Sequence, residues 1–506
     1  MHISIPVLLS FVGLTGQLAL AGAGGSTIKA CQELSKALPG RVSLPLSINY
    51  YREASEYWST VLRDIKPACV VLPESALEVG NTVKILNKYP DVKFTAKSGG
   101  HDPNPGHATV QDGVLISLGK ISGTTYDRSR NLAYVKPGGE WNDVISTLNK
   151  DGVTVVGGRL GIVGIGGFLL QGGISFLSSQ YGLAADNVVG WELVTSNGSI
   201  ISVDAGEQPE LAVALRGSGS QFGIVTQFTL KTYSIGKVWG GLRIYDESKS
   251  NDIFQALHGF VPDNTQEQKA AIIVSNLFAI GGTRAFIVFY FYDAENPPAS
   301  GPFANFLKIG SLIDITKTQT YAELLKSNGF GASLLNSRIS FRTLTIPYIP
   351  NKPSIYLEIS NKMRDITKNF LSNPFRLTSQ CSVDFQPLSS VVGKHTEDRG
   401  GNAMGLTGSD PDRIILEIQC SWSDKNDDET MRQFSRDLTS WIESMIPVWL
   451  EGQDGAKELY LPLFMNDAMA DQNVTGSYRD YDKLKLLQLQ ADPDGVLRTR
   501  TGGFKY

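Results

Sequence analysis

The sequence predicts an α+β protein built from more than one domain. The chain has 506 residues, whereas a typical domain has ~100–200. Hydrophobic residues make up 42% of the chain and charged residues 19%, which is enough apolar material for large cores. Short β-branched runs alternate with helical patterns up to about residue 235, and longer alternating runs follow. This change along the chain predicts two regions with different sheets.

Residues 1–23 predict a secretory signal peptide. An apolar run from Ile3 to about Leu14 is followed by the small residues of Ala19–Ala23, as before a signal-peptide cleavage site. The alternative is an uncleaved membrane anchor. However, Pro6 and Gly13 interrupt the run, and it is shorter than the ~20 apolar residues that span a bilayer. We therefore expect a secreted protein with no membrane partner.

Secretion permits disulfides, and four cysteines allow three pairings. Cys31 and Cys69 share the N-terminal part of the chain, so their pairing is the most economical. Cys381 and Cys420 lie close together late in the chain and are either bonded to each other or free.

Two Asn-X-Ser/Thr sequences, at Asn197 and Asn473, are acceptors for N-glycans. Asn197-Gly198 is also a hairpin-turn signal between the apolar runs Trp191–Thr195 and Ile200–Val203. The two roles are compatible, so we expect glycans at both asparagines and a hairpin at the first.

The first domain is expected over residues 24–235, with mixed strands. Its β-branched runs predict short strands, and its helical patterns begin near a capping Ser or Asn-Asp. In chain order we expect strand Val70–Leu72, helix Ser75–Lys88, strands Gly113–Leu118 and Ala133–Val135, helix Trp141–Lys150, and strands Thr154–Val156 and Phe222–Leu230.

A second domain is expected over residues 236–455, because alternation with one polar face predicts antiparallel strands covered on one side. The expected elements are strands Gly240–Tyr245, Ala270–Phe278, Arg284–Phe291 and Ile414–Trp422, and a covering helix Asp428–Trp441. Residues 456–506 return to loop and short-helix patterns, and we expect them to pack back onto the first domain.

Composition also excludes several classes of function. The chain carries 46 Lys+Arg against 50 Asp+Glu, a net charge of −4, without runs of one sign, so a nucleic-acid partner is not expected. It has five His and four Cys but no HExxH or paired CxxC motif. We therefore expect no metal site.

Glycine gathers in three stretches that could approach an anionic ligand. They are Ser98–His101, Gly157–Gly173 and Arg216–Gly223. Glycine lets backbone N–H groups come close to pyrophosphate, although tight-turn packing is the alternative. No Rossmann fingerprint fits, because Leu169 stands where its last glycine belongs.

Six segments, in their order and spacing, resemble the berberine bridge enzyme-like branch of the vanillyl-alcohol-oxidase flavoproteins. They are Ser98–His101, Val163–Gly167, Tyr181–Val188, Leu215–Gly217, Phe222–Thr226 and Asp492–Val496. The resemblance covers nearly all of the chain after the expected signal peptide. It implies a two-part PCMH-type FAD-binding domain, formed by the N-terminal half and the C-terminal segment. It also implies a substrate-binding domain with an antiparallel sheet covered by helices.

The resemblance assigns a set of residues to FAD. His101 corresponds to the histidine that carries the flavin covalently, and a neutral imidazole is a suitable nucleophile. The alternative is that His101 is a loop histidine whose ring only makes hydrogen bonds within the protein. Leu160 stands where many members have a cysteine that forms a second bond, so a single attachment through His101 is implied. The other cofactor-binding residues implied are Ser98, Gly99, Gly100, Val163, Gly164, Gly166, Gly167, Gly172, Gly173, Tyr181, Gly182, Asp186, Asn187, Gly223, Ile224 and Val225.

The proton acceptor departs from the family's usual pattern. Members commonly use a tyrosine in a YxNY element, but the matching segment here begins with Phe464 and ends with Asn466 and Asp467. Other members place a glutamate on a substrate-domain strand five residues before a tryptophan, and that position is Glu417. We expect Glu417 to be the base, Asp467 to be base or orienter, and Asn466 to shape the site. The alternative is that Glu417 faces solvent.

The resemblance implies an oxidase, and the expected signal peptide implies that it is secreted. It would dehydrogenate a small organic substrate by hydride transfer to covalent FAD and reoxidise with O2 to give H2O2. Val163 supports this expectation, because members with valine at this position tend to be oxidases. One alternative is oxidative cyclisation or dehydrogenation in alkaloid or polyketide metabolism. Another is a non-catalytic binding protein, since the YxNY tyrosines are missing.

Overall fold

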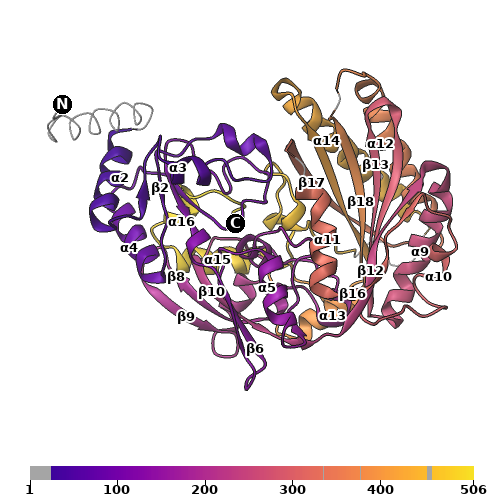
Figure 1. Ribbon diagram of the computed structural model, residues 1–506, viewed down its shortest axis with the longest axis horizontal. Helices are drawn as coiled ribbons and strands as arrows, with labels where there is room; N and C mark the ends of the chain where they lie inside the picture. The colour runs from indigo at the N-terminus through magenta and orange to yellow at the C-terminus, as the bar shows by residue number, and fades with distance from the viewer. Residues whose placement is uncertain (1–23, 334–335, 377, 453–458) are drawn as a thin grey trace, which may run out of the picture.

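The structure is a computed structural model that describes residues 24–333, 336–376, 378–452 and 459–506. The expected signal peptide, residues 1–23, lies outside these ranges. Figure 1 shows two halves side by side: one contains the N-terminal elements and the C-terminal segment, and the other contains a large sheet with covering helices. Within the described ranges, no helix has the length and apolarity needed to cross a membrane.

A four-stranded sheet begins the first half, in the order β1-β2-β4-β3. The central strands are parallel, and β1 pairs antiparallel at one edge. The strands are β1 (Val42–Ser43), β2 (Cys69–Val71), β3 (Phe94–Lys97) and β4 (Val114–Ser117), and the helices packed on them are α2 (Gly25–Ala37), α3 (Ile48–Glu53) and α4 (Ala76–Leu86). The disulfide Cys31–Cys69 joins α2 to β2, which confirms that pairing.

The second sheet of this half is antiparallel, in the order β5-β6-β10-β8-β9. The expected hairpin is confirmed, because β8 and β9 pair around Asn197-Gly198 and Gly198 has φ +80°. The elements are β5 (Thr124–Asp127), β6 (Leu132–Val135), α5 (Trp141–Asn149), β7 (Val153–Thr154), α6 (Ile165–Leu170), α7 (Ser178–Tyr181), β8 (Val188–Val194), β9 (Ile200–Asp204), α8 (Pro209–Leu215), β10 (Ile224–Lys231) and β11 (Tyr233–Ser234), which pairs with β7.

The large sheet has the order β15-β12-β14-β13-β18-β19-β17, with β16 also paired to β12. Every pairing is antiparallel, as the alternating patterns predicted. Its strands are β12 (Lys237–Asp246), β13 (Ala270–Ala279), β14 (Arg284–Tyr292), β15 (Ile313–Asp314), β16 (Lys317–Thr320), β17 (Arg338–Pro347), β18 (Gln380–Leu388) and β19 (Arg413–Trp422).

Three long helices share an apolar core with one face of this sheet: α9 (Ser250–Gln266), α12 (Ser354–Leu371) and α14 (Asp428–Leu450). Helix α14 runs past its expected end at Trp441, because the apolar positions continue and Trp449 still packs into the core. The shorter helices are α10 (Ala304–Leu307), α11 (Tyr321–Ser333) and α13 (Ser390–Asp398).

The other face of the large sheet turns toward the first half. Along β19, Ile414, Leu416 and Ile418 pack into the core under the helices, whereas Ile415 belongs to the core shared with the first half. Because side chains alternate between the faces of a strand, Glu417 lies on the same face as Ile415. The sheet thus presents Glu417 to the interface between the halves.

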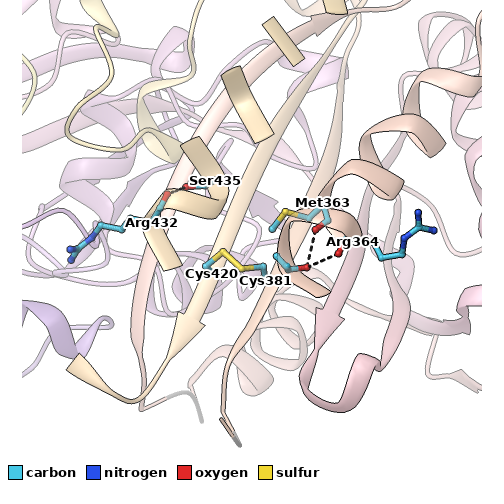
Figure 2. Close-up of a disulfide and its surroundings, with 7 residues drawn as sticks. Met363, Arg364, Cys381, Cys420, Arg432 and Ser435 are labelled. Carbon is cyan, nitrogen blue, oxygen red and sulfur yellow. Dashed lines mark hydrogen bonds between the residues drawn. A yellow bond between two sulfur atoms is a disulfide. The ribbon is translucent and has the colours of Figure 1, made fainter. Parts of the chain in front are cut away.

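A second disulfide, Cys381–Cys420, joins β18 to β19. The two cysteines are direct partners across the strands and are fully buried. Figure 2 shows the bond between these strands, with Met363 of α12 and Ser435 of α14 nearby. The sequence left this pairing open, and the structure has the two cysteines bonded.

The C-terminal segment returns to the first half and consists of η8 (Met465–Asp467), η9 (Thr475–Ser477), α15 (Tyr481–Ala491) and α16 (Val496–Arg500). Figure 1 shows α15 and α16, in yellow, among the N-terminal elements. The Asp492 carboxylate accepts from the N–H groups of Val496 and Leu497. The Arg500 guanidinium donates to the carbonyl oxygens of Leu86 and Val92, so α16 is fastened to the α4 region.

Candidate active site

A cavity of about 280 Å³ lies between the two halves. Its wall is formed by loops of the first half, by β17 and β19 of the large sheet, and by the C-terminal segment. The lining residues among those expected for the site are Ser98, Gly99, Gly100, His101, Leu160, Val163, Gly164, Gly166, Gly167, Gly223, Ile224, Val225, Glu417, Phe464, Asn466 and Asp467.

The Ser98–His101 loop follows β3 and rests on the start of α6. The Ser98 hydroxyl accepts from the N–H of Gly166 at 3.0 Å and donates to the carbonyl of Pro137. Gly99 and Gly164 are in backbone contact, because a Cβ on either one would come within 2.5 Å of the other's Cα. Glycine is therefore required at both positions.

His101 is held in an aromatic environment. The Trp58 ring stacks on the imidazole with 4.2 Å between centroids and a 13° interplanar angle, and Phe341 of β17 lies 6.4 Å away. Burial lowers the pKa of His101 to about 4, although Asp102 acts in the opposite direction. The imidazole is thus neutral near pH 7 and keeps a nucleophilic nitrogen lone pair.

A second histidine lies beside this loop. His107 Nδ1 is 2.8 Å from Asp102 Oδ2, and its ring meets Phe504 edge-on at 4.9 Å. Burial acts to raise the pKa of Asp102, but His107 and the backbone and side-chain N–H groups of Asn104 lower it overall. Asp102 therefore stays ionised directly after His101.

The segment that carries Leu160 and Val163 is fixed by α5. The backbone N–H of Trp141 donates to the Val163 carbonyl at 3.1 Å. A Cβ at Gly157 or Gly158 would come within 2.5 Å of the Trp141 ring. Leu160 and Val163 both line the cavity. A leucine offers no nucleophilic atom at that position.

Six of the expected cofactor residues do not lie on the cavity wall: Gly172, Gly173, Tyr181, Gly182, Asp186 and Asn187. Asp186 is buried and accepts from Thr396 Oγ1 at 2.7 Å and Asn402 Nδ2 at 2.8 Å. Asn187 donates to the carbonyl oxygens of Tyr181 and Leu183. These bonds hold the chain behind the wall.

Tyr181 and Gly173 also have structural contacts. The Tyr181 ring stacks on Tyr233 at 3.8 Å. The N–H of Gly173 donates to Asn466 Oδ1 at 3.0 Å, and Asn466 Nδ2 donates to the Phe168 carbonyl. Asn466 therefore anchors the C-terminal segment to the glycine-rich loop, where Gly172 and Gly173 have φ of +111° and +74°.

Glu417 belongs to a group of charged and polar side chains in which Gln386 and Asp467 are buried and Arg159, Asp384 and Glu417 are half-buried. Arg159 donates to Gln386 Oε1, and Gln386 Nε2 donates to Asp467 Oδ2 at 2.9 Å. Among the described residues, Glu417 has no hydrogen-bond partner although it lines the cavity. Its position excludes the alternative that it faces bulk solvent.

Three carboxyls of this group have raised pKa values. Burial, followed by repulsion from Asp467 and Asp384, raises the pKa of Glu417 well above its ordinary value, and Arg159 opposes this. Burial raises the pKa of Asp467 to about 6, opposed by Gln386 and Arg159. Burial also raises the pKa of Asp384 to about 6. Groups with such values can exchange protons near neutral pH.

Sequence analysis missed Trp58, Arg159 and Asp384. Asp384 lies in the polar-apolar alternation of Gln380–Leu388, a strand that the sequence analysis did not predict, and its register against β19 could have pointed to it. Arg159 carried a weaker signal, as a cation beside Leu160 in a glycine-rich loop. Trp58 carried none, because its contact with His101 joins two separate loops.

Comparisons with known proteins agree with this geometry. A family model described as "FAD binding domain" matches residues 67–204. An uncharacterized FAD-linked oxidoreductase of Arthroderma benhamiae is 32% identical, over 98% of this chain and 98% of its own. The FAD-dependent monooxygenase sdcF of Emericella nidulans is 30% identical, over 94% of this chain and 98% of its own.

Two solved structures share the fold. 6-Hydroxy-D-nicotine oxidase from Arthrobacter nicotinovorans has a TM-score of 0.73 at 20% identity, covering 91% of this chain and 96% of its own. Berberine bridge enzyme from Eschscholzia californica has a TM-score of 0.70 at 16% identity, covering 94% of this chain and 100% of its own.

The residues that line the cavity are suited to FAD. Backbone contact between Gly99 and Gly164 draws two glycine-rich loops together, and no atom lies within 4 Å of a Cβ position at Gly167. Loops without side chains allow close backbone approach to an anionic cofactor. The neutral His101 and the carboxyl group of Glu417 line the same cavity, where one ring system could contact both.

Proposed function

This chain belongs to the berberine bridge enzyme-like FAD-linked oxidoreductases, and from that premise we propose that it is an oxidase of a small organic molecule. The observation that carries the proposal is that His101 and Glu417, from different halves, line one cavity. When bound, FAD supplies the hydride acceptor and then the electron donor to O2. The chain's own residues bind the cofactor, orient the substrate and accept the proton.

The flavin is attached covalently through His101 alone. The lowered pKa of His101 keeps its imidazole neutral, and the Trp58 stack fixes the ring plane. Leu160 on the same wall cannot form a second bond.

Flavin fluorescence on a denaturing gel tests the attachment. The wild-type band should fluoresce and His101→Ala should lose the signal, whereas Leu160→Ala, a matched change on the same wall, should keep it. A dark wild-type band would overturn the attachment.

Glu417 takes the proton that leaves the substrate. Its carboxyl lines the cavity without a hydrogen bond to any residue that the structure describes, so a bound hydroxyl or amine can donate to it. Asp467 is held by Gln386 at 2.9 Å, which favours a role in orienting the site. Asn466 supports the wall through the Gly173 contact.

The protein is proposed to be secreted, with N-glycans at Asn197 and Asn473. Both side chains are exposed, as glycosylation requires. The expected signal peptide supports the location, and O2 would be available there as electron acceptor.

Anaerobic bleaching of the flavin by a panel of compounds tests the function. The panel holds alcohols and phenols, sugars, and alkaloid and polyketide precursors. Bleaching followed by H2O2 formation on readmission of air supports the oxidase. No bleaching by any member would favour a non-catalytic binding protein.

A second candidate is oxidation of a natural product, as cyclisation or dehydrogenation. Several relatives of 28–30% identity are called FAD-dependent monooxygenases, names that state an oxidation with O2 but no substrate. Bleaching by alkaloid or polyketide precursors alone would select this candidate.

A further inference from the structure

A polar row crosses four strands of the large sheet and reaches the cavity at Glu417. In register, Ser275 of β13 is opposite Asp384 of β18, Asp384 is opposite Glu417 of β19, and Glu417 is opposite Thr343 of β17. Directly opposite residues of an antiparallel pair share one face, with Cβ atoms about 4.5–5.5 Å apart. The carboxyls of Asp384 and Glu417 are therefore neighbours.

The group around this pair contains more acids than bases. Arg159, Asp467 and the pair itself make one guanidinium against three carboxyls, and the described residues form no ion pair of 4 Å or less between Arg159 and any of these acids. If all three carboxyls were ionised, two buried negative charges would be uncompensated, at a cost of several kcal/mol each. Some of these carboxyls must hold protons.

Hydrogen bonding indicates where a proton is held. Asp467 accepts a hydrogen bond from Gln386, which in turn accepts one from Arg159. These bonds stabilise the ionised form of Asp467. In contrast, Asp384 Oδ1 is buried without a partner, and Glu417 has no hydrogen bond within the described part of the chain. A protonated carboxyl donates an O–H, so a proton on Glu417 would supply a donor for Asp384 Oδ1, and a proton on Asp384 would supply a donor for Glu417.

We propose that Asp384 and Glu417 hold one proton between them, so that Asp384 is a positioning residue that sets when Glu417 can accept another. This inference rests on the proposed function, in which Glu417 is the base. In the substrate, an O–H or N–H bond breaks and its proton forms a bond to a Glu417 oxygen. The hydride carries the electron pair of the broken C–H bond to FAD. The pair then holds two protons and returns one to solvent.

The charged and titratable groups around the pair determine in which direction the pKa of Glu417 should shift. Arg159 and Asp467 act on both acids, Ser275 and Ser382 hydrogen-bond to Asp384, and Tyr321 acts on Arg159. His101, Asp102 and His107 line the same cavity. Since Asp384 contributes to the raised pKa of Glu417, removing its charge should let Glu417 ionise at lower pH.

Infrared pH-difference spectra of the flavin-loaded enzyme test this proposal without a substrate. Protonated-carboxyl bands should disappear on raising the pH in the wild type, and the band that Glu417→Gln removes but Asp467→Asn keeps belongs to the pair. Asp384→Asn should lower its midpoint by about one pH unit or more, a tenfold or larger fall in proton affinity. Thr343→Val is the matched control, because it flanks Glu417 on the other side without charge, and it should leave the midpoint in place.

Three results would overturn the proposal: no titrating band in the wild type, an unchanged or raised midpoint in Asp384→Asn, or an equal shift in Thr343→Val. Asp384→Ser repeats the test if the asparagine variant loses its flavin spectrum. Failure of the oxidase proposal is separate, because it would be seen as absent bleaching while the carboxyl band still titrates.

Discussion

At the scale of single residues, the site depends on neighbours that set the state of each reactive group. Burial and the Trp58 stack keep His101 neutral and oriented, whereas burial and neighbouring acids hold protons on Glu417. A base whose pKa is raised works only after it ionises. Flavin reduction should therefore accelerate as the pH rises through the Glu417 pKa.

Replacing Glu417 by Gln should slow flavin reduction ~10²–10⁴-fold, the usual contribution of a general base, and abolish this acceleration. Anaerobic stopped-flow with a substrate that bleaches the flavin measures both effects, and the visible spectrum should stay unchanged. If Asp467→Asn causes the loss instead while Glu417→Gln is neutral, the two roles are reversed.

Val163 governs a different step. It lines the cavity, and a longer side chain there would fill space that O2 needs to reach the ring. Val163→Leu should slow reoxidation of chemically reduced enzyme in aerated buffer by tenfold or more, while Leu160→Ala should not. Slow reoxidation of the wild type would remove the basis for an oxidase.

At the scale of elements, the large sheet supplies acids whose spacing depends on strand register. Cys381–Cys420 and Asp384–Glu417 are partner pairs on the same two strands. A shift by one residue would turn Glu417 to the helix-covered face. The disulfide thus supports the register on which the carboxyl pair depends.

Removal of this disulfide should lower stability. Cys381→Ala with Cys420→Ala opens a loop of 39 residues, which corresponds to about 3–4 kcal/mol of unfolding free energy. Denaturant unfolding measures the loss, and flavin attachment at His101 should survive in the native state. The expectation fails if unfolding is unaffected.

Local motifs allowed much of this site to be predicted from sequence. Ser98–His101 and Val163–Gly167 are read along the chain, and Glu417 was found by counting from Trp422. Asp384 was missed because its role depends on pairing with a strand whose register the sequence does not state. Asp186 was expected to bind cofactor but lies in a hydrogen-bond network with α13, which a linear motif cannot distinguish.

At the scale of the whole molecule, the buried acids couple stability to pH. The pKa of Asp467 is about 6 in the folded protein and about 4 when unfolded. The folded state therefore holds this proton more tightly, and stability falls as the pH rises from about 4 to about 6. Above that range the loss is complete.

Asp467→Asn should therefore become more stable relative to the wild type across this range, by up to about 3 kcal/mol at pH 7. Thermal unfolding of the flavin-loaded proteins at a series of pH values measures the difference. Asp471→Asn is the matched control, because Arg436 and Arg342 overcome burial and lower the Asp471 pKa, so its trend should be opposite. A pH-independent difference for Asp467→Asn would contradict the assignment.

The return of the C-terminal segment fixes the order of events during synthesis. The cavity takes His101 from early in the chain and Asp467, Gly503 and Phe504 from its end. At 5–20 residues per second, a ribosome needs roughly 20–80 s to travel between these positions. The Cys31–Cys69 bond can form early in that interval, but the cavity wall is complete only after Phe504 has been synthesised. We therefore expect flavin capture to follow synthesis of this last part of the wall, and a chain truncated before Gly503 should remain colourless.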